Sequence, residues 1–144
     1  MHRLLAIMIA FLGGLSIGTQ PSLNASLGKI IGVMEAALIS ITITFISILA
    51  CVLAFGQGQL SAVTSAQPYQ LLGGVLGAVF VIVSIVIVPV LGAATTLGVS
   101  IVGQLLAVII IDHFGLFGLP RIPFDFYRFI GILLLLIGSR LILK

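Results

Sequence analysis

Charged residues are scarce in this chain of 144 residues, of which 6% are Asp, Glu, Lys or Arg and 61% are hydrophobic. A water-soluble domain carries about four times that charged fraction. The composition therefore excludes a soluble domain and indicates an integral membrane protein. With nearly all of its length in apolar stretches, the chain has no room for a separate soluble domain.

Acidic residues and cysteine are also rare. The net charge of +3 reflects only three acids and includes no basic run that could follow a nucleic-acid backbone, so we expect no nucleic-acid partner. Cys51 is the only cysteine, which excludes an intrachain disulfide.

The common signatures of catalysis are also missing. The sequence has no Ser/His/Asp set with suitable spacing, no His/Cys metal cluster, no Walker loop and no Gly-rich nucleotide turn. We therefore expect no enzymatic activity, no catalytic residues, no metal site and no cofactor.

Five apolar stretches fill most of the chain, and each can cross about 30 Å of hydrocarbon as a helix rising 1.5 Å per residue. We predict an all-α membrane protein whose five transmembrane helices form one domain over residues 1–144. The predicted spans are residues 4–20, 33–55, 71–90, 93–111 and 126–143.

Proline and glycine set the predicted span boundaries. Pro21, flanked by the amides of Gln20 and Asn24, predicts that the first helix is interrupted or ends there. Pro89 and Gly92 divide an apolar run of about forty residues, which is too long for one membrane helix. We predict a tight turn at this point.

The six Lys and Arg residues show no preferred orientation. If five spans alternate across the membrane, three cations fall on each side: Arg3, Arg121 and Arg128 against Lys29, Arg140 and Lys144. The positive-inside rule needs an excess on one side, so both orientations should have nearly equal free energy. Chance alone also produces such a balance in a small chain with six cations.

Ionisable residues in a span are functional candidates because they are expensive to bury in a membrane. Glu35 is either an acid in the first turn of the second span, favoured by the helix dipole, or a carboxylate that couples proton or cation movement to transport. Asp112 and His113 close the fourth span, either as a proton relay or as a solvated pair at the membrane boundary.

Uncharged polar residues supply the other candidates. Gln20 and Asn24 flank the predicted helix break, where exposed backbone groups can bind a solute. Thr96, Ser100 and Gln104 recur every four residues and form a stripe that either lines a cavity or bonds a neighbouring helix. The candidate substrate path thus consists of Gln20, Asn24, Glu35, Thr96, Ser100 and Gln104.

Three segments resemble the YdcZ family of small, five-helix bacterial membrane proteins in the drug/metabolite transporter superfamily. They are Gln20-Pro21-Ser22-Leu23-Asn24-Ala25-x-Leu27-Gly28, Pro89-x-Leu91-Gly92-Ala93-Ala94, and Gly103-Gln104 leading to Ile111-Asp112-His113-Phe114-Gly115. The resemblance spans essentially the whole chain, and the third segment is its most specific part.

The resemblance implies a function. Ten-helix members of the superfamily look like two fused five-helix halves in inverted orientation, so this chain resembles one half. It implies a multi-pass secondary transporter of the bacterial inner membrane that moves a small organic solute or metabolite by alternating access. Its partners would be the lipid bilayer, the solute and a second copy in an antiparallel homodimer, or a paired homologue.

One departure and one alternative accompany this expectation. Small multidrug-resistance proteins of the same superfamily use a glutamate in their first span, whereas this chain has no acid there, so that role does not carry over to Glu35. The alternative function is a non-transporting accessory membrane subunit whose small-residue faces bind another protein.

Overall fold

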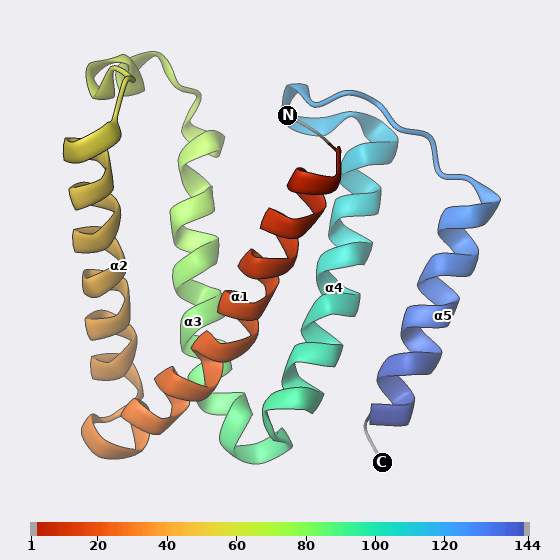
Figure 1. Cartoon of the computed structure of the whole chain (residues 1–144), viewed down its shortest axis with the longest axis horizontal. Coiled ribbons are helices and arrows are strands. Elements are labelled where there is room, and N and C mark those ends of the chain that lie inside the picture. Colours follow the sequence, from red (N-terminus) through yellow and green to blue (C-terminus); the bar gives the residue numbers. More distant parts are fainter. Residues whose placement is uncertain (1–2, 143–144) are drawn as a thin grey trace. The chain divides into compact units, whose positions relative to one another are not determined.

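The computed structural model describes residues 3–142, and in this part of the chain every regular element is a helix. The long helices are α1 (Arg3–Ile31), α2 (Val33–Phe55), α3 (Leu72–Leu91), α4 (Ala93–Phe114) and α5 (Phe126–Ile142) (Figure 1). Short 3-10 helices, η1 (Leu60–Ser65), η2 (Pro68–Leu71) and η3 (Leu116–Gly118), lie in the connections. The predicted all-α fold is confirmed. The end of the predicted fifth span at Leu143, and the cation Lys144, lie outside the described residues.

Four of these elements are long and apolar enough to cross a membrane: α1, α2, α4 and the stretch Pro68–Leu91 that contains α3. In α5, 17 residues are described, which is about the lower limit for a membrane-spanning helix. The chain is thus an all-α membrane protein, as its composition predicts.

The chain divides into two compact units, Met1–Val90 and Leu91–Lys144. The first contains α1, α2 and α3, and the second contains α4 and α5. A single transmembrane domain over residues 1–144 stays a prediction.

The predicted helix break at Pro21 is wrong, because α1 continues through Pro21 to Ile31 and extends the first predicted span by eleven residues (31 against 20). Proline is tolerated inside a membrane helix where neighbouring structure covers the disrupted turn. The Pro21 side chain is buried. Its ring nitrogen carries no hydrogen, so the Ile17 carbonyl loses the donor that would normally reach it from four residues later.

Single glycines, not prolines, separate α1 from α2 and α3 from α4. Gly32, between α1 and α2, has φ 99° and ψ 158°, and Gly92, between α3 and α4, has φ 82° and ψ 157°. Such positive φ values favour glycine, which has no Cβ to clash. The tight turn predicted between the third and fourth spans is confirmed at Gly92. Pro89, also predicted as a helix break, lies within the last turn of α3 and does not break it.

Both backbone groups of Gly32 keep their hydrogen bonds at this turn. The Gly32 N–H donates to the Gly28 carbonyl at 3.0 Å, and the Gly32 carbonyl accepts from the Ala36 N–H at 3.0 Å. One glycine therefore reverses the chain, and α1 and α2 contact each other near this turn and diverge away from it (Figure 1).

The core of the first unit is small. Ala36 and Ala37 of α2 pack with Val81 and Ile85 of α3. Gly28 of α1 joins this contact, since a Cβ built on it would lie 2.6 Å from Cγ2 of Ile85. A Cβ at position 28 would therefore force the Ile85 side chain to move, and glycine there favours the close approach of α1 to α3.

In the second unit, α4 contacts α5 through small residues. A Cβ built on Gly98 would lie 3.6 Å from Cβ of Ser139, which is ordinary van der Waals contact. This is the close helix packing expected where hydrophobic burial does not drive association.

Candidate functional site

One face of α1 carries a groove lined by six residues, named here the α1 polar groove: Leu15, Ser16, Thr19, Gln20, Leu23 and Asn24. Its volume is about 460 Å³. The lining residues form two adjacent rows along one helix, each with an interval of four residues, which places them on one side. Gln20 and Asn24, two of the predicted path residues, thus lie in the same groove because α1 stays helical through Pro21.

Asn24 has an unusual environment at the edge of this groove. Its side chain is only 7% exposed. Nδ2 is buried and makes no hydrogen bond with any part of the chain that the structure describes, whereas Oδ1 is not enclosed in this way. A buried amide hydrogen without an acceptor costs about 1–3 kcal/mol, so this nitrogen calls for a partner.

The other polar residues of the groove divide into two kinds. The hydroxyl groups of Ser16 and Thr19 donate to the carbonyls of Leu12 and Leu15 at 3.2 and 2.8 Å, and are satisfied by their own helix. Gln20 is half-buried and, within residues 3–142, its side chain has no hydrogen-bond partner.

Glu35 lies outside the groove. It is exposed in the first turn of α2, and its carboxylate curls back over Gly32. A carboxylate at this position interacts favourably with the positive end of the helix dipole. The groove itself is lined by no ionisable residue.

Burial decreases along the predicted polar stripe on α4. Thr96 is buried, Ser100 is half-buried and Gln104 is exposed. The Thr96 hydroxyl donates to the Gly92 carbonyl at 2.8 Å, next to the turn between α3 and α4. Ser100 and Gln104 make no side-chain hydrogen bond to the described residues. The stripe therefore contains one residue bonded to its own backbone and two that are free.

Asp112 joins α4 to α5 and to the connection between them. Its carboxylate accepts from Arg128 Nη1 at 3.1 Å, and its backbone carbonyl accepts from the Ile122 N–H at 2.8 Å. Asp125 caps the start of α5 by accepting from the Arg128 N–H at 2.8 Å. The Asp112 carboxylate thus binds the helix that follows.

His113 has a similar structural role. Nδ1 accepts from the Phe124 N–H at 3.2 Å, and the His113 carbonyl accepts from Arg121 Nε at 2.9 Å. Together these two bonds tie the end of α4 to the connection that precedes α5. Asp112 and His113, predicted as coupling residues, therefore fix the loop between α4 and α5 here.

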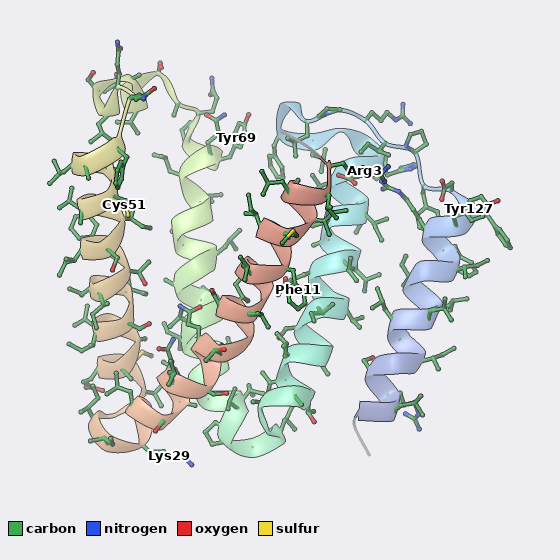
Figure 2. All side chains as sticks on the ribbon, in the orientation of Figure 1. Arg3, Phe11, Lys29, Cys51, Tyr69 and Tyr127 are labelled. Atoms are coloured by element: carbon green, nitrogen blue, oxygen red, sulfur yellow. The ribbon has the colours of Figure 1, made fainter. Side chains whose placement is uncertain are left out.

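Two other features carry less chemistry. Cys51 lies exposed on α2, in an apolar hollow it shares with Ser47, Ile48, Val52, Phe55 and Gly56 (Figure 2). Among the described residues, no group of three or more His, Cys, Asp or Glu side chains could hold a metal ion.

Sequence reasoning missed Ser16 and Thr19 as groove residues, and Asp125 as a cap. Ser16 could have been predicted, because Ser16, Gln20 and Asn24 recur every four residues once α1 is read as one helix. An aspartate just before an apolar stretch is likewise a known signal for a helix start.

The sequence profile of the family described as "Putative inner membrane exporter, YdcZ" matches residues 5–141, almost the whole chain. No curated protein and no solved structure matches it. The family is one of membrane exporters and not a class of enzymes. With its apolar helices and this match, the chain belongs to the YdcZ family of drug/metabolite transporters and is a multi-pass inner-membrane transport protein.

Proposed function

We propose that this chain is a secondary transporter that exports a small organic solute by alternating access, with the α1 polar groove as part of the solute path. The observation that carries the proposal is Asn24 Nδ2, buried beside the groove and without a partner among the described residues. Lipid offers no hydrogen-bond acceptor, so an unpaired donor in a membrane helix costs several kcal/mol. A solute that pairs with Asn24 as it passes accounts for a residue that folding alone would disfavour.

An accessory subunit makes a different prediction. The polar side chains of an accessory subunit would form bonds between its helices, as Asp112 of α4 and Arg128 of α5 do in their ion pair. Gln20 and Asn24 make no such bonds within residues 3–142. Their free state favours transport over a purely structural role.

The transporter is proposed to form an antiparallel homodimer. Arg3 and Lys29 lie at opposite ends of α1 (Figure 2). Arg128 and Arg140 lie in the first and last turns of α5. Cations at both ends give the positive-inside rule no excess to act on. Two copies inserted in opposite directions would rebuild the complete transporter that one half resembles. A paired homologue is the other arrangement that would do so.

Transport is tested with purified protein in vesicles, by measuring protein-dependent flux of a panel of metabolites with and without a pH gradient. We expect saturable flux of at least one neutral solute, and its loss in Asn24→Leu. Gln57→Leu, an exposed position in the connection after α2, is the matched control and should keep full flux. Equal flux in Asn24→Leu and in the unaltered protein would overturn the proposed path.

Orientation is tested with cysteine labelling in a Cys51→Ser background, since Cys51 is exposed and would react. Leu119→Cys places a thiol at an exposed position between α4 and α5. We expect about half of the molecules to react with a membrane-impermeant maleimide from each side. Gln59→Cys, in the connection after α2, should give the same fraction for a five-span chain. Reaction from one side only would contradict the antiparallel homodimer.

A further inference from the structure

We infer that the α1 polar groove binds an uncharged solute carrying a hydrogen-bond donor beside an acceptor, as a carboxamide does, with Asn24 as the central contact. The inference rests on the proposed function, whose solute path it fills. Its evidence is the chemistry that the groove leaves unsatisfied.

The Asn24 amide selects for such a group. Nδ2 is enclosed and unpaired, while Oδ1 is not enclosed. A half-turn of χ2, the torsion about the Cβ–Cγ bond, exchanges the two atoms, so either can face the groove. A solute group that carries both a donor and an acceptor can therefore pair with whichever atom of the Asn24 amide faces the groove. A solute with an acceptor alone pairs with it in only one of the two orientations.

Gln20 repeats this requirement one turn earlier. It lines the same groove, is half-buried, and has no side-chain hydrogen bond to the described residues. Residues four apart on a helix have Cβ atoms about 5–6 Å apart, so one small solute can reach both amides. The hydroxyl hydrogens of Ser16 and Thr19 are already donated to their own helix, which leaves their oxygens as acceptors. The groove therefore favours a solute rich in N–H donors.

Charge is disfavoured by what lines the groove. Its six residues include no ionisable side chain. Lys29 and Glu35, which follow in the chain, are exposed and do not line it. A charged solute would enter without a counter-ion, which is costly in a membrane. A volume of about 460 Å³ suits a small molecule.

The test uses the fact that Asn24 is the only asparagine in the chain. Cell-free synthesis with 15N-asparagine therefore gives one side-chain amide signal in the NMR spectrum of the protein in micelles. The probes are malonamide, with an amide at each end, malonamate, with one carboxylate, and 3-aminopropanamide, with one ammonium. All three keep at least one amide, so their comparison isolates charge.

We expect malonamide to shift the Asn24 side-chain protons saturably, and the two charged probes to bind at least tenfold more weakly. Gln20→Leu should weaken malonamide binding about fivefold, as the loss of one hydrogen bond predicts. The control Gln57→Leu should leave it unchanged. Equal or tighter binding of a charged probe would overturn the inference.

A second variant separates a solute contact from an internal one. Ser84, buried on α3, donates to the Val81 carbonyl at 2.8 Å and keeps an oxygen that can accept. If Ser84→Ala shifts the Asn24 signal and no probe does, Asn24 serves folding and the inference fails, while flux in vesicles can still support transport. If malonamide binds but is not moved across vesicles, the binding inference stands and the proposed function fails.

Discussion

Polar side chains gather in two places, the α1 polar groove and the connection between α4 and α5, and their hydrogen bonding differs. At the connection, Asp112 pairs with Arg128, and His113 accepts from the Phe124 N–H. In the groove, the amides of Gln20 and Asn24 have no such partners among the described residues. Both places carried functional candidates in the sequence.

The difference distinguishes polar groups whose hydrogen bonds stabilise the fold from polar groups that are available to bind a solute. A satisfied group stabilises the fold and gains nothing from a solute, because it would first have to break its own bond. An unsatisfied group gains the full bond when a solute arrives. The free amides of α1 are therefore better candidates for solute contact than the ionisable pair that ends α4.

The largest effect is expected for Asn24→Leu, which keeps the branching at Cγ and removes both polar atoms. Flux or binding should fall about five- to thirtyfold, because the loss of a donor and an acceptor is worth about 1–2 kcal/mol. Stability should rise by about 1–3 kcal/mol, since a buried unpaired donor is removed. Thermal unfolding in detergent beside vesicle flux measures both. A loss of stability would mean that Asn24 is paired after all.

The opposite pattern is expected for Asp112→Asn and Arg128→Gln. Each should lower stability by about 1 kcal/mol, because both side chains are partly exposed and the ion pair is only partly desolvated. Flux per folded molecule should stay unchanged. A double-mutant cycle on the free energy of unfolding should show coupling between the two positions. Additive effects would show that the pair does not join the helices.

A smaller effect is expected for His113→Phe, which keeps an aromatic ring and removes the acceptor for the Phe124 N–H. The cost should be about 1 kcal/mol or less, felt mainly in the loop. Hydrogen exchange of the Phe124 amide should become about fivefold faster, while exchange within α1 should not change. Equal protection in both proteins would show that this bond does not order the loop.

The smallest effects are expected on α2, whose hydroxyl groups donate to their own helix. Thr42 and Ser47 reach the carbonyls of Leu38 and Ile43, each at 2.8 Å. Thr42→Val and Ser47→Ala should change stability by less than about 0.5 kcal/mol and leave flux unchanged. A tenfold loss of flux in either variant would break the distinction between satisfied and free polar groups.

The sequence predicted the apolar framework well. Residues 33–55 were predicted as a span and form α2 with the same limits, because a long apolar run bounded by glycines allows little else in lipid. Pro21 and Pro89 misled the prediction, since proline is a strong local breaker in soluble helices but a tolerated one in membranes. Gly32 had a usable signal, with basic Lys29 before it and acidic Glu35 after it, as helix ends prefer.

By itself the sequence determined that this protein is a helical membrane protein, because apolar length and composition leave no other stable state for such a chain. The sequence also determined its membership of the YdcZ family, through the match over residues 5–141. Only the tertiary structure decided which polar groups are occupied. Asp112 finds Arg128 sixteen residues later, whereas Asn24 Nδ2 finds no acceptor within residues 3–142. Hydrogen bonds depend on the distance and direction between atoms, and for residues far apart in the chain only the packing of helices sets these.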